Sequence, residues 1–275
     1  MSDSAEKKLL ADAIAWWTTG IIDVEPGSIA VRGYPIQDLI GRISFTQMIW
    51  LMLRGEMPSA QQSRLLEAAL VASVDHGPHA PAIAIARMAA TCGVGLNNAV
   101  ASGVNVLGDI HGGAGQQCME IYESIERARG ERGLESATET VLDDFVAEYG
   151  KIIPGFGHRF HPIDPRVAPL FALLEATAAQ GVVSGNYARI GRAVEAALLQ
   201  RIGKAVPMNI DGVTAVIFCE LGFAAALGRG LFVLARSVGI MAHAWEQMQR
   251  GERIKGPMPK QIPYTYDGPA MRHMD

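Results

Sequence analysis

The segment Gly108-Asp-Ile-His-Gly-Gly-Ala-Gly115 interrupts a long stretch of helical composition with one histidine and four glycines. Residues 97–107 before it and the run toward Arg127 after it both have the composition of helices. Similar loops recur at Asp75-His-Gly-Pro-His79, Pro154-Gly-Phe-Gly-His-Arg159 and Asn209-Ile-Asp-Gly212. Each carries a histidine or an aspartate beside glycine at a helix boundary. Loops held by rigid helices are where binding and catalytic residues concentrate.

The segments between these loops are predicted to be helices. Ser59-Ala-Gln-Gln62 has the form of a capping box and predicts a helix toward Ser73. Ser136-Ala-Thr-Glu139 predicts a second such helix, which Gly150 ends, and Asp164-Pro165 predicts an N-cap followed by proline in the first turn. Further helices are predicted at 45–53, 81–92, 187–202 and from 213 through 245, the last one broken around 228–230.

Strand signals are scarce. Residues 21–24 and 28–31 flank Glu25-Pro-Gly27 and predict one small hairpin near the N-terminus. Neither GxxxxGK[ST] nor GxGxxG occurs, which excludes a parallel-sheet nucleotide-binding fold. The sequence therefore predicts an all-α protein with one small β-hairpin.

The amino-acid composition excludes several classes of protein. The chain has 275 residues, of which 49 % are hydrophobic and 19 % charged, with a formal net charge of −4. This balance excludes a disordered chain, and the absence of a Lys/Arg cluster argues against a nucleic-acid partner. A low charged fraction at this size suggests that an oligomer interface hides surface.

The compartment is predicted from the cysteines and the N-terminus. Cys92, Cys118 and Cys219 are odd in number and lack C-x-x-C spacing, so they are interpreted as buried thiols of a reducing compartment. No signal-peptide pattern is seen at the N-terminus, and the apolar stretches at 214–218 and 221–227 are interrupted by charges before they reach bilayer length. We expect a cytoplasmic protein without a membrane partner.

His111, Arg166 and Asp211 each allow two interpretations. His111 at a helix N-terminus favours its neutral form and could donate to a developing enolate, or it could be a satisfied core histidine in a tight turn. Arg166 could bind a carboxylate or pair with a surface glutamate. Asp211 could be an acid/base or the N-cap of an apolar helix. A metal site at His76/His79 or His158/His161 is disfavoured, because Pro78 and Pro162 keep both pairs off regular helices.

Taken together and in this order, the four loops resemble those of the citrate synthase superfamily. The resemblance includes Arg32-Gly-Tyr-Pro-Ile36, Leu53-Arg-Gly-Glu-Met-Pro58, Ala235-Arg-Ser-Val-Gly239 and Ala242-His-Ala-Trp245. It implies a homodimer, or a dimer of dimers, of two-domain helical subunits. A small domain at 112–220, on the coenzyme A side of the cleft, would be inserted into a large domain formed by 1–111 and 221–275.

Three details are similar to the citryl-CoA lyase module of ATP-citrate lyase rather than to a synthase: Asp75-His-Gly-Pro78, Gly108-Asp109 and Asn209-Ile-Asp-Gly212. His111, in contrast, matches the catalytic histidine of the synthases, at a position where the ATP-citrate lyase module has a different residue. The resemblance implies cleavage of citryl-CoA, or of a related 3-hydroxy-3-carboxyacyl-CoA, to acetyl-CoA and oxaloacetate.

The resemblance also implies a role for each site residue. His111, His158 and Asp211 would be catalytic. His76, Arg166 and Arg236 would hold substrate carboxylates, with Arg253 as the counterpart of an arginine that the family takes from the partner subunit. Coenzyme A, as part of the substrate, would meet Pro154, Gly155, Phe156, Gly157 and Arg159. No metal and no covalently bound cofactor are expected.

Two other functions remain open. The first is a short citrate or 2-methylcitrate synthase that condenses an acyl-CoA with oxaloacetate. The second is a non-catalytic paralogue that binds coenzyme A or a dicarboxylate within a larger assembly. Neither changes the predicted fold.

Overall fold

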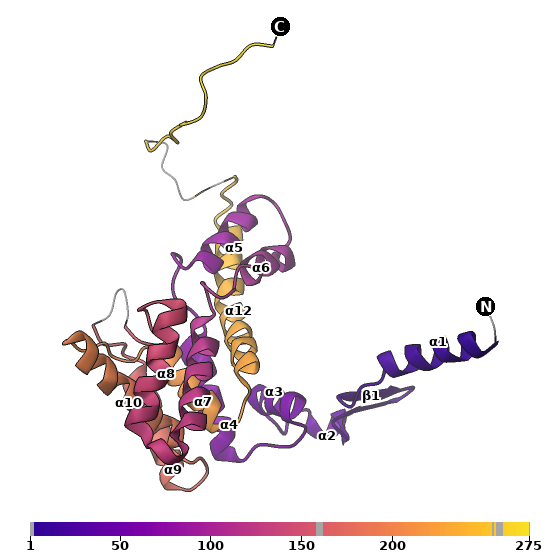
Figure 1. Ribbon diagram of the computed structural model, residues 1–275. Coiled ribbons are helices and arrows are strands. Elements are labelled where there is room, and N and C mark those ends of the chain that lie inside the picture. Colours follow the sequence, from indigo (N-terminus) through magenta and orange to yellow (C-terminus); the bar gives the residue numbers. More distant parts are fainter. Residues whose placement is uncertain (1–2, 158–161, 255, 257–260, 275) are drawn as a thin grey trace.

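The computed structural model describes residues 3–157, 162–254, 256 and 261–274. It is mostly helical, which confirms the predicted class. Figure 1 shows a body of packed helices, an N-terminal arm that leaves the body on one side, and a C-terminal segment that runs beyond it.

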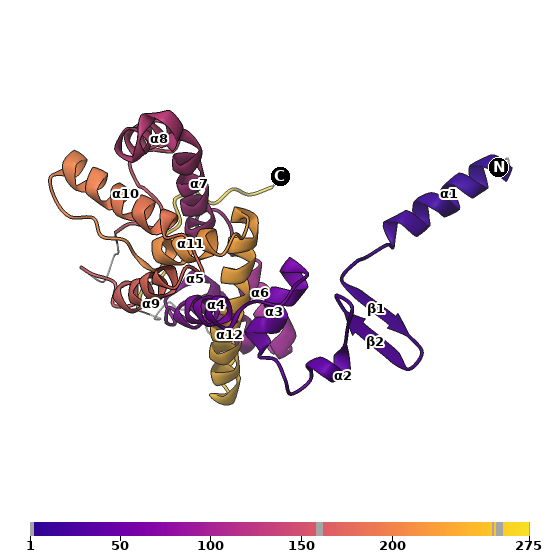
Figure 2. The ribbon, with the colours of Figure 1, turned by 90° about the horizontal axis from the view of Figure 1, so that it is seen from below.

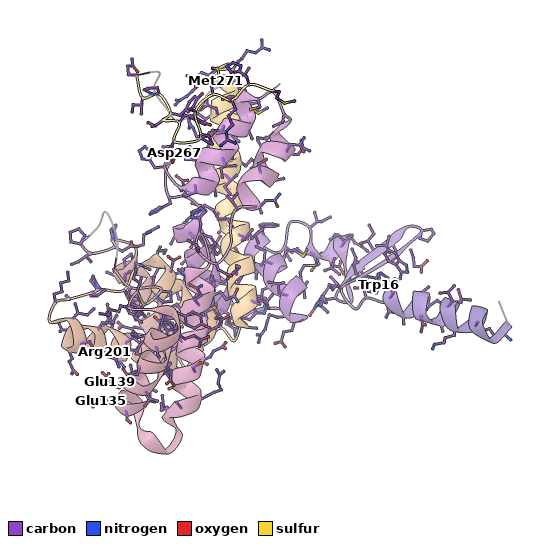
Figure 3. The ribbon with its side chains drawn as sticks, turned by 45° about the horizontal axis from the view of Figure 1, so that its top comes forward. Trp16, Glu135, Glu139, Arg201, Asp267 and Met271 are labelled. Atoms are coloured by element: carbon purple, nitrogen blue, oxygen red, sulfur yellow. The ribbon has the colours of Figure 1, made fainter. Side chains whose placement is uncertain are left out.

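The arm consists of α1 (Asp3–Trp16), a small sheet and α2 (Ile36–Leu39). The predicted hairpin is present as β1 (Ile22–Glu25) and β2 (Ser28–Val31), and the sequence missed a third short strand, β3 (Tyr34–Pro35), which pairs with β2. Trp16 on α1 is 81 % exposed and points into solvent (Figure 3). In both ribbon views α1 lies away from the body (Figures 1 and 2).

Two helices of the body begin where local sequence predicts. α3 (Phe45–Arg54) starts at Ser44 and α4 (Ala60–Ser73) at Ser59, and each has both hydrogen bonds of a capping box. Gly55, with φ +83°, ends α3 in the left-handed conformation that glycine adopts at no steric cost. Both helices lie next to α12 in Figure 2.

The remaining helices complete the body. α5 (Pro81–Thr91) and α6 (Leu96–Val104) pack together against one half of α12 (Ala225–Gln249), and α4 and α7 also contact α12. The largest core joins α7 (Ala114–Arg132), α8 (Leu134–Tyr149), α9 (Val167–Ala179), α10 (Asn186–Ile202) and α11 (Ile210–Glu220) to α4.

Three predicted boundaries are wrong. α8 begins at Leu134 after Gly133 (φ +78°), so Ser136 lies inside the helix and caps nothing, although Gly150 does end it. α9 begins at Val167, two residues later than Asp164-Pro165 predicts. The break in the last apolar segment lies at 221–224, around Gly222 (φ +71°), rather than at 228–230.

α12 is continuous and 25 residues long, and by length and composition it could cross a bilayer, which the sequence analysis did not expect. Gly228 does not break it; a Cβ at this position would lie 2.3 Å from the Met119 Sδ, so the glycine allows close packing on α7. α12 also contains Arg236, which is 5 % exposed and donates to the Ser73 carbonyl. We therefore interpret α12 as the central helix of the body.

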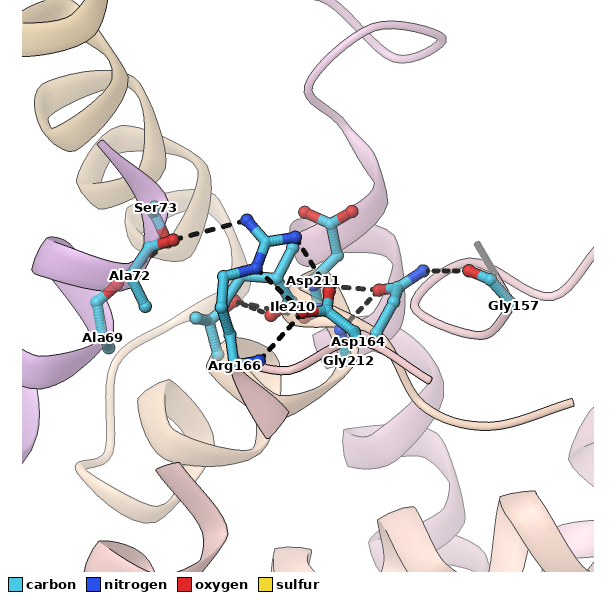
Figure 4. A network of polar contacts seen from close by, with 11 residues as sticks. Ala69, Ala72, Ser73, Gly157, Asp164, Arg166, Ile210, Asp211 and Gly212 are labelled. Carbon is cyan, nitrogen blue, oxygen red and sulfur yellow. Dashed lines mark hydrogen bonds and ion pairs between the residues drawn. The ribbon is translucent and has the colours of Figure 1, made fainter. Parts of the chain in front are cut away.

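The Asp164 carboxylate connects the start of α9 to the start of α11 through hydrogen bonds. This carboxylate, whose side chain is fully buried, accepts hydrogen bonds from the Arg166 backbone N–H (3.1 Å), from Nε (2.9 Å) and Nη2 (2.8 Å) of the same arginine, and from the Ile210 N–H (3.0 Å) (Figure 4). Burial raises the pKa of Asp164, but the bonds from Arg166 outweigh it and lower the pKa to about 2. This carboxylate fixes the N-terminus of α11 relative to the segment before α9.

We predict that Asp164→Asn lowers the free energy of unfolding by about 2 kcal/mol at neutral pH. The native pKa lies below the value of 3.8 expected for the unfolded chain, so this stabilisation is present above about pH 4 and is lost as the pH falls toward 2. Urea unfolding between pH 2 and 7 measures this free energy. The difference in free energy between wild type and variant should vanish at acid pH. Glu139→Gln, which breaks the surface pair with Arg201 (Figure 3), is the control with little expected effect. Parallel pH curves for wild type and Asp164→Asn would contradict the assignment.

Candidate active site

The C-terminal end of α4 brings two arginines together. The last carbonyls of a helix have no partner within it, and its negative end favours cations. Here the Arg166 Nη1 donates to the Ala72 carbonyl (3.4 Å), and the Arg236 Nε donates to the Ser73 carbonyl (3.1 Å). Two guanidinium groups from α12 and from the start of α9 therefore meet at one helix end. Such a pair suits a ligand with two carboxylates.

The positive charge of Arg236 interacts with the other charged residues of the site. Its guanidinium lies over the Phe232 ring, with Cζ 4.8 Å from the ring centroid. Burial lowers the pKa of Arg236, the carboxylates of Asp211 and Asp75 raise it, and Arg166 lowers it. All three charged groups are therefore near enough to interact with Arg236.

Arg166 is held from one side by Asp164. The alternative of a surface pair with a glutamate is wrong, because its partner is the buried Asp164. The contacts with Asp164 and Ala72 use three of the five N–H donors that a guanidinium carries. The side chain is 22 % exposed. It is thus oriented but still partly accessible to a ligand.

His111 lies in the loop before α7 and is half-buried. Its Nε2 accepts a hydrogen bond from the Ala82 N–H (3.1 Å), so the neutral ring carries its proton on Nδ1. Burial lowers the pKa of His111, and the nearby charge of Arg236 lowers it further. At neutral pH this histidine is an uncharged N–H donor.

The loop that carries His111 is fixed on both sides. Asp109 forms an ion pair with Arg229 of α12 (2.6 Å), and the Gly108 N–H donates to the His111 carbonyl (2.9 Å). A Cβ on Gly113 would lie 2.5 Å from the Asp109 carbonyl oxygen, so only glycine fits this turn. The imidazole is therefore held in place by its own loop.

Asp211 lies in the first turn of α11, but it does not cap the helix. The cap is Asn209, whose Oδ1 accepts from the Asp211 N–H (2.9 Å) and the Gly212 N–H (3.3 Å). Because Asn209 supplies the cap, the Asp211 carboxylate is not needed for that role.

Residues 154–157 pair with residues 207–209 beside α11. The Gly157 N–H donates to the Pro207 carbonyl (2.8 Å), and the Asn209 N–H donates to the Gly155 carbonyl (2.9 Å). A Cβ on Gly212 would lie 2.4 Å from the Gly155 oxygen, so the two backbones touch. Phe156 is 7 % exposed and packs edge-on against Tyr122, which leaves the backbone of this loop, and not the ring, to meet a ligand.

A hollow of about 870 Å³ lies beside Pro154, between α7 and α8. Its charged lining residues are four acids and one base: Asp109, Glu120, Asp144, Glu148 and Arg229. This charge balance repels a polyphosphate, so the phosphates of coenzyme A do not suit this hollow.

His76 follows the end of α4 and is exposed. It lies in a turn that Asp75 organises. Burial raises the pKa of Asp75, but the hydrogen bonds from His243 and from the Gly77 N–H help to outweigh it, so the pKa is lowered. The turn is therefore built around a charged carboxylate.

The structure does not test two of the predicted site residues, and it places a third, Arg253, elsewhere. His158 and Arg159 lie outside the described residues, as does His161. Arg253 is exposed beyond the end of α12, where the Ile254 N–H donates to the Thr91 carbonyl. The 13 helical steps from Arg236 to Gln249 span roughly 20 Å, so Arg253 cannot hold the same carboxylate as Arg236 of the same chain. In the part of the chain that the structure describes, no three His, Cys, Asp or Glu side chains form a metal site.

Three residues that orient the site were not predicted from the sequence. Asp164 was interpreted only as a helix cap, although its two-residue spacing from Arg166 allows a side-chain pair. Asn209 lies two residues before Asp211, and an asparagine at that spacing is a common cap. Arg229, the partner of Asp109, is 120 positions away in sequence, and no local signal identifies it.

Comparison with known proteins agrees with this arrangement. The family model "Citrate synthase, C-terminal domain" matches residues 11–68 and 58–257. The citrate synthase of Acidithiobacillus ferridurans is 28 % identical over 210 residues, which are 75 % of this chain and 52 % of that protein. That of Haloferax volcanii is 29 % identical over 74 % of this chain and 52 % of its own length. The chain thus spans about half the length of these curated relatives.

A solved structure is similar over nearly its full length. Citryl-CoA lyase from Hydrogenobacter thermophilus has a TM-score of 0.82 and 32 % sequence identity, with 94 % of this chain and 97 % of that one covered. Citrate synthase from Thermotoga maritima has a TM-score of 0.64 and 26 % identity, with 85 % and 60 % covered. The family match, the helical fold and the loops gathered around Arg236 lead to one conclusion: the chain belongs to the citrate synthase family.

Proposed function

We propose that this protein cleaves citryl-CoA, or a related 3-hydroxy-3-carboxyacyl-CoA, to acetyl-CoA and oxaloacetate. The observation that carries an enolate reaction of this kind is the neutral His111, held as an Nδ1–H donor within the influence of Arg236, one of the two arginines at the end of α4. The similarity in fold and sequence to a citryl-CoA lyase supports cleavage over condensation.

In the proposed reaction, the arginines hold the free carboxylates of the substrate together with His76. A base takes the proton of the tertiary hydroxyl, and the bond to the adjacent CH₂ breaks. The hydroxyl carbon becomes the ketone of oxaloacetate, while the electron pair moves onto the departing thioester as an enolate. His158, which lies outside the described residues, is the proposed base.

The enolate is the difficult species, because it is too basic to form free in water at neutral pH. His111 donates its Nδ1–H to the thioester oxygen as charge develops there, and a neutral donor does so without surrendering its proton. Asp211 delivers a proton to the terminal carbon and ends as a carboxylate, which the charge of Arg236 stabilises. The backbone of residues 154–157 is the proposed contact for coenzyme A.

A citrate or 2-methylcitrate synthase is the second candidate, favoured by the curated relatives and by the presence of His111. Both candidates share the proposed two-domain division at 111/112 and 220/221, which falls in the loop before α7 and in the turn between α11 and α12. Both also need no bound metal or covalently bound cofactor. They differ in the fate of the thioester.

We predict that citryl-CoA yields oxaloacetate without release of free thiol. Oxaloacetate is measured by coupled reduction with malate dehydrogenase, and free coenzyme A with a thiol reagent, on the same sample. Thiol release that keeps pace with substrate loss would show a synthase running with hydrolysis. No turnover of citryl-CoA, and none of acetyl-CoA plus oxaloacetate, would show a non-catalytic paralogue.

We predict that His111→Ala and Asp211→Asn each lower kcat by about 10²–10³ while the far-ultraviolet circular dichroism stays that of wild type. Each variant removes a group that acts on the developing enolate, so KM should change much less than kcat. Asp143→Asn, at a surface carboxylate that pairs with Arg201, is the matched control. Wild-type kcat in both variants would show that the site is assigned wrongly.

We also propose that the chain assembles as a homodimer or a dimer of dimers. Leu234, Val238, Met241 and Trp245 form an exposed apolar stripe on α12 at spacings of four, three and four. A groove of about 560 Å³ between α3 and α12 continues this stripe. α1 and the residue after it expose a second apolar surface, formed by Leu9, Leu10, Ile14, Trp16 and Trp17. An isolated helix of 14 residues is marginal in water, so α1 needs a surface to pack on. A second copy supplies apolar surface of the same kind.

We predict that light scattering gives at least twice the mass of the 29.4 kDa chain. Val238→Glu combined with Met241→Glu should shift the protein toward a smaller species, because two charges would be buried in the interface. Ile262→Glu, at an exposed residue beyond α12, is the control. A monomeric wild-type protein would exclude this assembly.

A further inference from the structure

Successive residues on one face of α12 contact successive residues at the C-terminal end of α4. Arg236 donates to the Ser73 carbonyl, and one turn later Gly239 lies against the next residue, Val74. A Cβ on Gly239 would lie 2.3 Å from the Val74 carbonyl oxygen and 3.0 Å from the Asp75 Oδ1. No larger residue fits there without movement of the backbone.

His243, two turns after Arg236, continues this series. Its Nε2 lies 3.3 Å from the Asp75 Oδ2, and its Nδ1 lies 3.4 Å from the Arg87 Nη1. A guanidinium can only donate, so Nδ1 accepts from Arg87, and the proton of the neutral ring is on Nε2 and is donated to Asp75. The side chain is 20 % exposed.

Arg87 is itself held in position. Its Nη1 lies 2.8 Å from the Glu246 Oε2, and the second oxygen of Glu246 accepts from the Arg250 Nη2 (2.9 Å). A chain of contacts therefore runs from Glu246 at the surface through Arg87 and His243 to Asp75.

The two oxygens of the Asp75 carboxylate differ in their hydrogen bonding. Its Oδ1 is buried and, among the described residues, has no hydrogen-bond partner. An acceptor left without a hydrogen bond is destabilising, and such groups in native proteins often mark a functional constraint. Its Oδ2, in contrast, accepts from the Gly77 N–H (3.2 Å) as well as from His243. The carboxylate thus shapes the turn that presents His76.

We propose that His243 is a positioning residue: through Asp75 it holds the 75–77 turn so that His76 meets a carboxylate of the substrate. The inference rests on the proposed function, which assigns His76 to that carboxylate. His243 does not touch the substrate. Its removal should therefore weaken substrate binding and leave the chemical step, which depends on His111 and Asp211, nearly unchanged.

The test compares His243→Leu with His243→Gln. Leucine removes both contacts, and we expect the KM for citryl-CoA and the calorimetric Kd for oxaloacetate to rise about tenfold, with kcat within about threefold of wild type. A glutamine amide can still donate to Asp75 and accept from Arg87, so His243→Gln should retain KM and Kd within about threefold. His273→Leu, at an exposed histidine of the C-terminal segment, is the control for the loss of a histidine.

Gly239→Ala tests the same turn from another side and keeps the inference falsifiable should His243→Leu fail to fold. The added methyl group has no room, so the turn must shift, and we expect KM and Kd to rise at least tenfold with kcat again little changed. Gly230→Ala on the same helix, where a Cβ meets nothing within 4 Å, is the matched control and should leave KM and Kd unchanged.

The outcomes separate this inference from the proposed function. Absence of citryl-CoA turnover in the wild type would refute the proposed function, while the Kd for oxaloacetate would still report on the turn. A fall in kcat equal to the rise in KM, or a His243→Gln variant as weak as His243→Leu, would overturn the positioning role. Failure of the wild type to bind oxaloacetate would overturn both.

Discussion

The C-terminal end of α4 lies inside the body, and the site depends on how the unpaired carbonyl groups of this helix end are satisfied. A helix that stops at Ser73 leaves carbonyl groups without partners, and burial makes each unpaired carbonyl costly. Guanidinium groups meet this need and bring positive charge with them. Two such charges at one helix end repel each other, so each requires a carboxylate nearby. Asp164 serves Arg166, and Asp211 and Asp75 face Arg236. The polarity of the site follows from where one helix ends.

Burial and the charge of Arg236 together decide the protonation state of His111. A histidine next to a buried cation loses proton affinity, and the Ala82 N–H occupies the one nitrogen that could otherwise accept a proton. The ring is left as a neutral donor, which is what an enolate oxygen requires. Gly155 and Gly212 touch through their backbones and thereby bring residues 154–157 beside Asp211. Donor, carboxylate and backbone loop are thus set by contacts among helix ends and loops.

Local sequence predicted those parts of the fold that depend on local interactions. Ser59 and Gln62 satisfy each other within one turn, so their helix is recognisable without its neighbours. Ser136 and Glu139 show the same pattern, but Gly133 starts the helix earlier and makes that cap unnecessary. Gly228 was mistaken for a break because its reason, close packing on Met119, lies on another helix. Arg229 was missed in the same way, because its pairing with Asp109 is fixed by tertiary structure, as is the bond from the Ile210 N–H to Asp164.

On the proposed roles, one cation serves both directions of the reaction. Arg236 adds to the effect of burial in keeping His111 neutral, so the donor is ready when the enolate forms. It also stabilises Asp211 as a carboxylate, which is the product of protonating carbon and the reactant for abstracting a proton. Neither effect favours cleavage over condensation. A lyase and a synthase can therefore share these residues. The two enzymes differ only in whether water reaches the thioester. The residues that decide the direction must then be sought around the thioester and the loop at 154–157, because excluding water there preserves acetyl-CoA.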